Sequence, residues 1–292
     1  MKSNNHPTGK TRLVGLVGSD ISLSLSLAIH NQAFQSLGLN YLYVPLPVNP
    51  SHPDRLREAV LGLRALGFIG ANVTMPFKEK IIHHLDDLTP AAKRIGAVNT
   101  LLIDKNDRLV GGNSDSGGFL ADLQANQIEW KSRPVLLLGA GGAARAVAYG
   151  LSETGCHSIS IFNRTASRAE RLAEDIHDLF PNQKVEASQQ LEEWSHRPRA
   201  LIINCTPVGM HSILSPSGHR MLWPMRLKFR PDQVVADLIY APVKTPLLLK
   251  AKSDGAKTIN GIGMLIHQAA LSFTWWTDKT PPIAHMHAAI QA

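Results

Sequence analysis

Glycines at a characteristic spacing follow an apolar run in the middle of the chain. Residues 135–138 read Val-Leu-Leu-Leu, and Gly139-Ala140-Gly141-Gly142-Ala143-Ala144 comes directly after them. Where a strand turns into a helix, the first glycine permits the tight turn and the second lets the backbone approach a pyrophosphate. Amide groups at the start of the helix then bind the phosphates. The pattern predicts a dinucleotide site formed by Gly139, Ala140, Gly141, Gly142 and Ala143.

The next predicted strand, over 158–162, indicates which dinucleotide is bound. A site for NAD would place Asp or Glu at the end of this strand, to accept from the ribose 2′-hydroxyl. The chain instead has Asn163-Arg164-Thr165, with Arg168 one helical turn further on. A carboxylate would repel a 2′-phosphate, whereas two guanidinium groups can bind its oxygens by charge-assisted hydrogen bonds. The sequence therefore predicts NADP, although Arg168 alone could equally be a solvated residue on a helix face.

Hydride transfer between such a coenzyme and a carbinol needs a group that exchanges a proton with the reacting hydroxyl. Lys78 and Asp115 are the candidates for this pair. Pro76 suits the first turn of a helix, so we expect a helix over 77–85 with Lys78 one turn into it. Asp115 follows Asn113 and Ser114 at the junction with the predicted nucleotide domain. Considered alone, each of the two is more often a surface charge than a catalytic group.

Strands and helices alternate along the chain and would position these residues. Apolar runs predict strands over 13–17, 41–46, 68–73, 135–138, 158–162, 200–204 and 234–238. Helices are predicted after Ser26, over 56–66 and 119–126, from the glycine loop to 153, from 261 through 276, and near the C-terminus. The sequence predicts an α/β protein of two domains. One is a substrate domain with a mainly parallel sheet, and the other is a Rossmann-type NADP-binding domain.

Composition limits the classes of protein and of partner. With 44% hydrophobic and 18% charged residues, the chain is typical of a globular protein, and no stretch approaches the ~18 apolar residues of a membrane helix. The start lacks the features of a signal peptide, and two cysteines exclude a disulfide framework, so we expect a cytoplasmic location. The net charge of +7 comes from scattered residues, which favours an anionic small molecule over nucleic acid. The histidines lack the spacing of a metal site, and no metal is expected.

Motifs along nearly the whole chain resemble those of the shikimate dehydrogenase family. In addition to the glycine loop, the matching stretches are Ser24-Leu25-Ser26, Asn72-Val73-Thr74-Met75-Pro76-Phe77-Lys78, Gly96-Ala97-Val98-Asn99-Thr100, Asn113-Ser114-Asp115, Asn163-Arg164-Thr165, Asn204-Cys205-Thr206-Pro207-Val208-Gly209-Met210, Asp237-Leu238-Ile239-Tyr240, and Gly261-Ile262-Gly263-Met264 with Gln268. Several of these are near signatures of the family, and together they are highly specific.

The resemblance implies roles for individual residues. Lys78 would be the acid/base at the hydroxyl being oxidised, and Asp115 would hydrogen-bond both the substrate and the lysine ammonium. The residues implied in substrate binding are Ser24 and Ser26 at the substrate carboxylate with Tyr240 nearby, and Thr74, Asn99 and Gln268 at the ring hydroxyls. The residues implied on the nicotinamide side are Thr206, Met210, Leu238, Gly261 and Met264. We expect a substrate domain over 1–114, a nucleotide domain over 115–260, helices over 261–292 that return to the substrate domain, and a cleft that closes over both ligands.

Three functions stay open. The first is a shikimate dehydrogenase that reduces 3-dehydroshikimate with NADPH, the second a quinate/shikimate dehydrogenase, and the third a catalytically weak NADP-binding sensor. Where the family usually reads Asn-Pro-x-x-His-Ser-x-Ser-Pro, residues 19–27 lack both prolines and the histidine, and Asp20 adds a negative charge. Ser114 stands where threonine is usual, and Ala241 where asparagine is common. The stretches 72–74 and 163–165 favour the first function, and a homodimer is left open.

Overall fold

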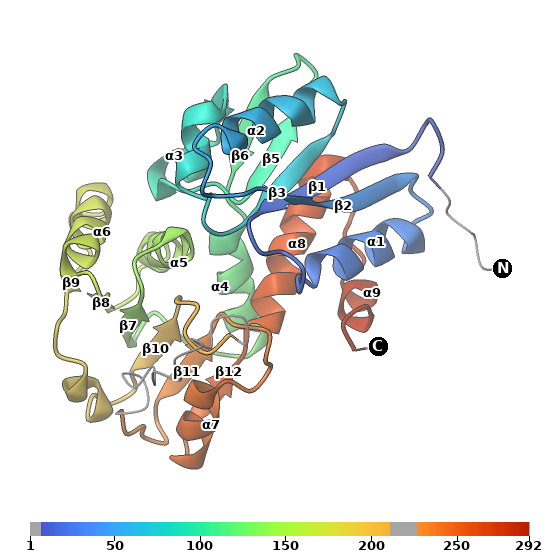
Figure 1. Ribbon diagram of the computed structural model, residues 1–292. Helices are drawn as coiled ribbons and strands as arrows, with labels where there is room; N and C mark the ends of the chain where they lie inside the picture. The colour runs from blue at the N-terminus through green and yellow to red at the C-terminus, as the bar shows by residue number, and fades with distance from the viewer. Residues whose placement is uncertain (1–6, 211–226, 292) are drawn as a thin grey trace. The chain divides into compact units, whose positions relative to one another are not determined.

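The computed structural model describes residues 7–210 and 227–291. They form two compact units, one of residues up to Gly118 and from Ile266 onward, and one of Phe119–Leu265. The boundaries fall inside two helices, α4 (Asp115–Ala125) and α8 (Ile262–Thr277) (Figure 1). The predicted domain boundaries after residues 114 and 260 divide the chain by the ligand that each part binds, and they stay a prediction. No helix in the described part of the chain combines the length and the apolar character needed to cross a bilayer.

The first unit contains a six-stranded sheet with the order β2-β1-β3-β5-β6-β4. Strand β1 (Arg12–Gly18) is parallel to both neighbours, β2 (Tyr41–Pro47) and β3 (Gly70–Val73). Strands β5 (Thr100–Ile103) and β6 (Leu109–Gly112) form an antiparallel hairpin beside β3, and β4 (Asp87–Leu88) is parallel to β6. The three predicted strands are confirmed. The hairpin was not predicted.

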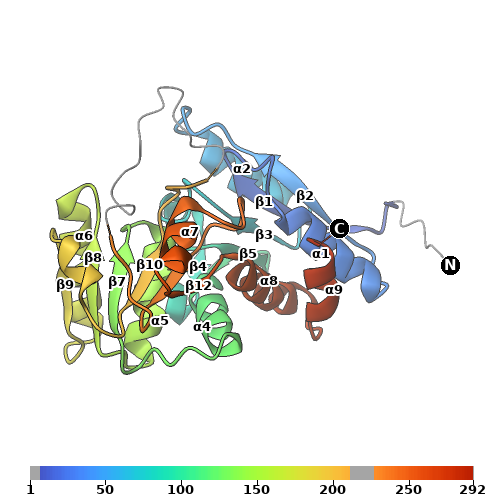
Figure 2. The ribbon, with the colours of Figure 1, turned by 90° about the horizontal axis from the view of Figure 1, so that it is seen from below.

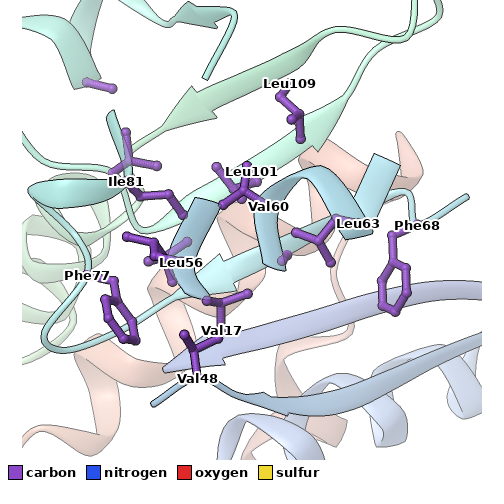
Figure 3. Close-up of a cluster of buried hydrophobic side chains, with 14 residues drawn as sticks. Val17, Val48, Leu56, Val60, Leu63, Phe68, Phe77, Ile81, Leu101 and Leu109 are labelled. Atoms are coloured by element: carbon purple, nitrogen blue, oxygen red, sulfur yellow. The ribbon is translucent and has the colours of Figure 1, made fainter. Parts of the chain in front are cut away.

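Helices cover both faces of this sheet. Figures 1 and 2 show α2 (Arg55–Ala65) on one face and α1 (Ser26–Ser36), the C-terminal part of α8 and α9 (Ile283–Ala288) on the other. Helix α3 (Pro90–Ile95) precedes β5. Leu56, Val60 and Leu63 recur at helical spacing on α2 and pack into a cluster with Val17 and Leu101 of the sheet (Figure 3). This cluster fixes the sheet edge that carries the candidate site.

The helix predicted over 77–85 is wrong. The Met75–Pro76 peptide is cis, residues 75–79 form turns, and only a short 3-10 helix, η1 (Lys80–His84), follows. The backbone carbonyl of Lys78 accepts from the Val98 amide at 2.8 Å, a bond to a distant segment instead of to the next helical turn. Lys78 therefore lies in a turn close after β3.

The second unit contains a fully parallel six-stranded sheet with the order β12-β11-β10-β7-β8-β9. Its elements in chain order are β7 (Pro134–Leu138), α5 (Gly142–Glu153), β8 (Ser158–Phe162), α6 (Ala166–Leu179), β9 (Val185–Ala187), η2 (Glu192–Ser195), β10 (Leu201–Asn204), β11 (Val234–Asp237), α7 (Pro246–Ser253) and β12 (Lys257–Ile259). This is the Rossmann order, in which the direction of winding reverses between β7 and β10. The predicted Rossmann-type fold is confirmed.

A buried histidine lies in the first unit, on the face of the sheet covered by α1 and α8. The ring of His30 stacks on Tyr43 with 4.5 Å between centroids and lies 5.2 Å from the ring of Trp276. Complete burial lowers the pKa of His30 to about 3, although the Asn72 side chain favours the charged form. The imidazole is therefore neutral in the folded protein at neutral pH. Trp276 is buried, so this part of α8 belongs to the core of the first unit.

Replacing His30 by phenylalanine should reduce the sensitivity of the fold to acid. Below pH 6.5 the unfolded chain binds a proton at this residue that the folded chain does not bind. His30 should therefore lower the free energy of unfolding by about 1.4 kcal/mol per pH unit as the pH falls from 6.5 towards about 3. Urea titrations at several pH values would compare wild type, His30→Phe and the control His52→Phe at an exposed position. Equal slopes in wild type and His30→Phe would contradict this account.

Candidate active site

The sheet of the first unit brings four segments to one edge. Strands β1 and β3 end together, because Val17 pairs with Val73. Strand β5 begins where β3 ends, because Asn72 pairs with Thr100, and β6 ends beside it, because Thr100 also pairs with Gly112. The residues after β1, after β3, before β5 and after β6 therefore meet at this edge, although they are far apart in sequence.

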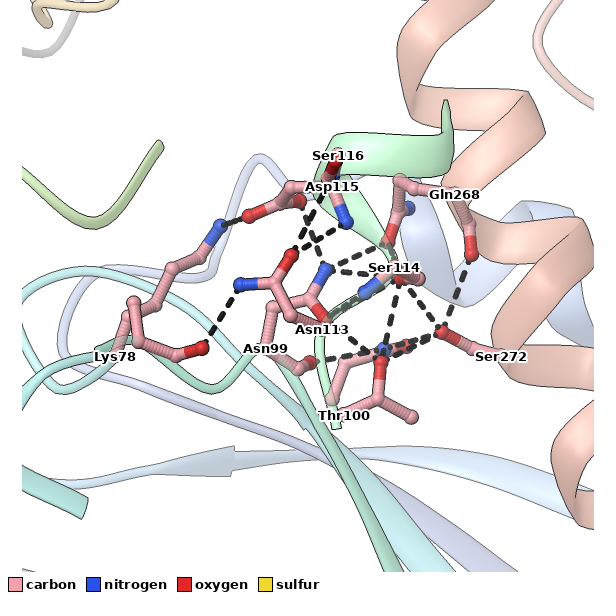
Figure 4. A network of polar contacts seen from close by, with 11 residues as sticks. Lys78, Asn99, Thr100, Asn113, Ser114, Asp115, Ser116, Gln268 and Ser272 are labelled. Carbon is pink, nitrogen blue, oxygen red and sulfur yellow. Dashed lines mark hydrogen bonds and ion pairs between the residues drawn. The ribbon is translucent and has the colours of Figure 1, made fainter. Parts of the chain in front are cut away.

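Lys78 and Asp115 form an ion pair at this edge, with 2.5 Å between Nζ and Oδ2 (Figure 4). Their side chains are 17% and 6% exposed. Lys78 comes from the turn after β3, and Asp115 is the first residue of α4. The structure thus brings together the two residues that the sequence selected. A pair so little exposed to water needs further hydrogen bonds to offset its desolvation.

Asn99 supplies the further hydrogen bond on the other carboxylate oxygen. Its Nδ2 donates to Asp115 Oδ1 at 2.8 Å and to Ser114 Oγ at 2.9 Å. Its Oδ1 accepts from the Ser114 backbone N–H at 2.7 Å and from the Thr100 hydroxyl at 2.9 Å. A backbone N–H can only donate, so it fixes which end of the amide faces Ser114 and leaves Nδ2 for Asp115. The carboxylate therefore has a donor on each oxygen.

Two residues of α8 extend this network. Gln268 Oε1 accepts from Ser114 Oγ at 3.3 Å, and Ser272 lies 2.9 Å from the Thr100 hydroxyl (Figure 4). Ser272 also accepts from Asn72 Nδ2 at 3.0 Å. Gln268 was predicted as a site residue, whereas Ser272 and Thr100 were missed. The four-residue spacing from Gln268 to Ser272, which places both on one helix face, is a signal that could have identified Ser272.

The remaining residues predicted to bind the substrate come from both units. Ser24 Oγ accepts from the Ser26 backbone N–H at 3.3 Å, and Ser26 is the buried first residue of α1. Thr74 is half-buried and follows β3 directly. These three residues belong to the segments after β1 and β3. Tyr240 belongs to the second unit, where it follows β11.

The second unit aligns the predicted nucleotide-binding residues along the carboxyl edge of its sheet. Phe162, Leu138, Asn204 and Asp237 are register partners at the ends of four neighbouring strands. The segments that follow these strand ends carry Asn163, Arg164 and Thr165 after β8, the glycine loop after β7, Thr206 and Met210 after β10, and Leu238 after β11. Ligands of open parallel sheets bind outside this edge, beside the reversal of winding.

The glycine loop has the geometry of a phosphate site. Gly139 has φ +111°, in the region that favours glycine, and a Cβ there would lie 3.0 Å from the Thr206 methyl group. Gly141 precedes the first residue of α5, and a Cβ added to it would have no described atom within 4 Å. Ala144 is fully buried and lets α5 lie close to the sheet. The open backbone at the start of a helix fits a dinucleotide phosphate.

The end of β8 fits a phosphorylated ribose. Arg164 and Arg168 are both exposed, and Arg168 donates to the Ala140 carbonyl of the glycine loop at 3.3 Å. Asn163 Nδ2 donates to the Thr165 carbonyl at 2.9 Å and shapes the turn between them. The two guanidinium groups can therefore bind an anion next to this loop.

Glycine is also required where α8 begins. A Cβ on Gly261 would lie 2.2 Å from the Leu238 carbonyl oxygen, so only glycine allows this close approach. Met264, in the first turn of α8, is buried. The segment after β12 is thereby held against the segment after β11.

Comparisons with known proteins agree along the chain. The family model for the shikimate dehydrogenase substrate binding domain matches residues 16–101, and the model for shikimate / quinate 5-dehydrogenase matches residues 120–200. The model for the shikimate 5'-dehydrogenase C-terminal domain matches residues 261–291. A shikimate dehydrogenase (NADP(+)) of Carboxydothermus hydrogenoformans is 42% identical over 287 residues, which cover 97% of both chains. The chain belongs to the shikimate dehydrogenase family.

Solved structures of this family share the fold. A shikimate dehydrogenase in complex with NADP+ superposes with a TM-score of 0.86 at 38% identity, over 98% of this chain and 96% of the other. The enzyme of Thermus thermophilus in complex with NADP(H) and shikimate has a TM-score of 0.81 at 36% identity, over 96% and 99%. A quinate dehydrogenase from Corynebacterium glutamicum in complex with NAD has a TM-score of 0.84 at 28% identity, over 96% and 99%. The family thus includes members named for shikimate and a member named for quinate.

Removing the Asn99 amide should destabilise this shikimate dehydrogenase family member. In Asn99→Ala, Asp115 Oδ1 loses its Asn99 donor and the Ser114 N–H loses its acceptor, both in a buried setting. The free energy of unfolding should fall by about 2–3 kcal/mol, measured by urea titration. Asn106→Ala, at an exposed turn, is the control and should change it by less than about 0.5 kcal/mol. An Asn99→Ala variant as stable as wild type would show that the network is not needed to hold the ion pair.

Proposed function

We propose that the protein is an NADP-dependent shikimate dehydrogenase, which reversibly reduces 3-dehydroshikimate to shikimate. The observation that carries the proposal is the Lys78–Asp115 ion pair, held on its second oxygen by Asn99, at the sheet edge of the first unit. Family membership and the NADP(+)-dependent relative at 42% identity support the coenzyme and the substrate class. The third function considered, a sensor without catalysis, would not need this ion pair.

The charge state of the ion pair suits the reductive direction. NADPH, when bound, supplies the hydride that adds to the carbonyl carbon of the substrate. The ammonium of Lys78 holds the proton that the carbonyl oxygen needs as it becomes a hydroxyl. Asp115 Oδ2 holds Nζ in place, and the reverse reaction returns the hydroxyl proton to Nζ. Lys78 and Asp115 are therefore the proposed catalytic residues.

Hydrogen-bonding side chains at the same edge support recognition of a polyhydroxylated acid. We propose that Ser24 and Ser26 donate to the substrate carboxylate, with Tyr240 nearby. Thr74, Asn99 and Gln268 would bind ring hydroxyls. Both Asn99 amide hydrogens already have acceptors in the protein, so a substrate hydroxyl would share one of them. Direct pairing of this kind rejects analogues that lack a hydroxyl.

The coenzyme would lie along the carboxyl edge of the second sheet. Residues 139–143 would bind the pyrophosphate, and Asn163, Arg164, Thr165 and Arg168 would bind the ribose with its 2′-phosphate. The residues proposed on the nicotinamide side are Thr206, Met210, Leu238, Gly261 and Met264. Hydride transfer requires contact between nicotinamide and ring carbon, so the proposal requires the two units to bring their ligands together during turnover.

The second candidate function is a quinate/shikimate dehydrogenase. It is favoured by residues 19–27, where the chain lacks the two prolines and the histidine usual in the family beside Ser24 and Ser26. A loop of different shape at the carboxylate could accept a related cyclohexane acid. The two candidates share the ion pair and differ only in the acid bound.

The location and the assembly are also proposals. Two cysteines in 292 residues fit a reducing compartment, and we propose the cytoplasm. A homodimer stays a prediction, which analytical ultracentrifugation would check.

Assays with two acids and two coenzymes test the function. Purified enzyme should oxidise shikimate with NADP faster than quinate with NADP, and faster than either acid with NAD. Lys78→Ala should lower kcat by about 100- to 10,000-fold, because it removes the proton-exchanging group. Lys80→Ala, at an exposed position two residues away, is the matched control and should keep the wild-type kcat. Unchanged kcat in Lys78→Ala would reject the catalytic assignment, and turnover of quinate alone would favour the second candidate.

Coenzyme choice should depend on Arg164. In Arg164→Ala, loss of charge-assisted hydrogen bonds to the 2′-phosphate should raise the KM for NADP by about 10- to 100-fold and leave the KM for NAD unchanged. Arg171→Ala, which removes an exposed arginine from α6, the helix that follows Arg164, should change neither KM. Equal increases for both coenzymes would mean that Arg164 does not contact the 2′-phosphate.

A further inference from the structure

A buried carboxyl group lies at the end of β11. Asp237 is 1% exposed, and no Lys, Arg or His in residues 7–210 and 227–291 forms an ion pair with it. Its Oδ1 accepts from Asn204 Nδ2 at 3.0 Å and from the Ile239 N–H at 3.1 Å, and its Oδ2 accepts from the Thr245 hydroxyl at 2.6 Å. Burial raises the pKa of Asp237 to about 6, although these three donors favour the charged form. A buried acid that costs stability is often kept for a function of its site.

The three donors connect Asp237 to three different segments. Asn204 ends β10, and its Oδ1 accepts from the Thr206 N–H at 3.1 Å and from the Thr206 hydroxyl at 2.6 Å. Ile239 belongs to the segment after β11. Thr245 is fully buried before α7, and its hydroxyl oxygen accepts from the Leu248 N–H at 3.3 Å as a helix cap. One carboxylate thus joins the loop after β10, the loop after β11 and the start of α7.

The two loops also pack against each other. Gly209, in the loop after β10, has φ +110°, and a Cβ there would lie 3.5 Å from Ile239 and from Thr245. These loops carry Thr206 and Leu238, which belong to the proposed nicotinamide side. A shift of the loop after β11 would therefore move Leu238 and change the packing of the loop that carries Thr206.

An asparagine could not replace this acid without loss. The Thr245 oxygen already accepts from Leu248, so its hydroxyl hydrogen is directed at Asp237 Oδ2. With the asparagine oxygen at the Oδ1 position, the Thr245 hydroxyl would lack an acceptor; with the oxygen at the Oδ2 position, the Asn204 amide and the Ile239 N–H would both lack one. The three donors require a hydrogen-bond acceptor at both oxygen positions, which a carboxylate provides.

We propose that Asp237 is a positioning residue of the coenzyme site, which holds the loops over 204–210 and 238–245 in the conformation that binds the nicotinamide half of NADP. It acts through Asn204, Ile239 and Thr245 and contacts no ligand itself. This inference rests on the proposed function and adds a residue to which that function assigns no role.

Calorimetric titration with NADP and hydrogen exchange test the proposal. In Asp237→Asn the Kd for NADP should rise about tenfold, a loss of about 1.4 kcal/mol. Amide exchange should accelerate in 204–210 and 238–245, while the KM for shikimate at saturating NADP stays within about twofold of wild type. Asp178→Asn, an exposed acid of the same unit, is the control and should match wild type throughout.

A second pair of variants tests the same link with less disturbance. Thr245→Val removes the donor to Oδ2 and should raise the Kd for NADP in the same direction. Thr245→Ser keeps the hydroxyl and should restore wild-type affinity and exchange. If Asp237→Asn fails to fold, the comparison of Thr245→Val with Thr245→Ser tests the positioning role.

The outcomes separate this inference from the function on which it rests. A lower melting temperature with unchanged NADP affinity and unchanged loop exchange would overturn the positioning role. Wild type that binds no NADP and oxidises neither acid would instead reject the proposed function. Wild type that is active, with Thr245→Val and Thr245→Ser equal in affinity, would overturn the inference alone.

Discussion

The ion pair between Lys78 and Asp115 is the constraint on which the first unit depends. Two charges so little exposed are tolerated only if their remaining hydrogen-bonding positions are filled. Asn99 fills the second carboxylate oxygen, and its own orientation is fixed by the Ser114 backbone. Through Ser114 and Thr100 the network reaches Gln268 and Ser272 on α8. Two polar side chains of a C-terminal helix thus complete the hydrogen-bond network around the pair.

In both units, the ends of neighbouring strands bring the candidate site residues to one edge of the sheet. In the second unit all strands are parallel, so four carboxyl ends in register present their loops along one edge. In the first unit the β5–β6 hairpin runs antiparallel to β3, so the start of β5 and the end of β6 reach the edge where β1 and β3 end. The hairpin therefore lets Asn99 and Asp115 come from a short stretch of chain and still face Lys78.

Features that depend on residues close in sequence could be predicted, whereas features that depend on tertiary contacts could not. The glycine loop and the Rossmann order were predictable, because tight turns and buried parallel strands leave signals within a few residues. Lys78 was expected in a helix, and the structure places it in a turn, because a tertiary bond from Val98 competes with the helical pattern after Pro76. The β5–β6 hairpin, Thr100 and Ser272 were missed for a related reason. Their roles come from pairing and helix packing, which one sequence does not display.

The two buried carboxylates, Asp115 and Asp237, differ in the groups that contact their oxygens. Asp115 lies against a lysine ammonium, so charge is balanced within the pair. Within the described part of the chain, Asp237 accepts from neutral donors, namely an amide, a backbone N–H and a hydroxyl. The three donors belong to the segments around Asn204, Ile239 and Thr245, so the carboxylate joins these segments. Both Asp237 oxygens are thus directed at donors of the protein, whereas Asp115 has one oxygen on an amide and the other on a cation.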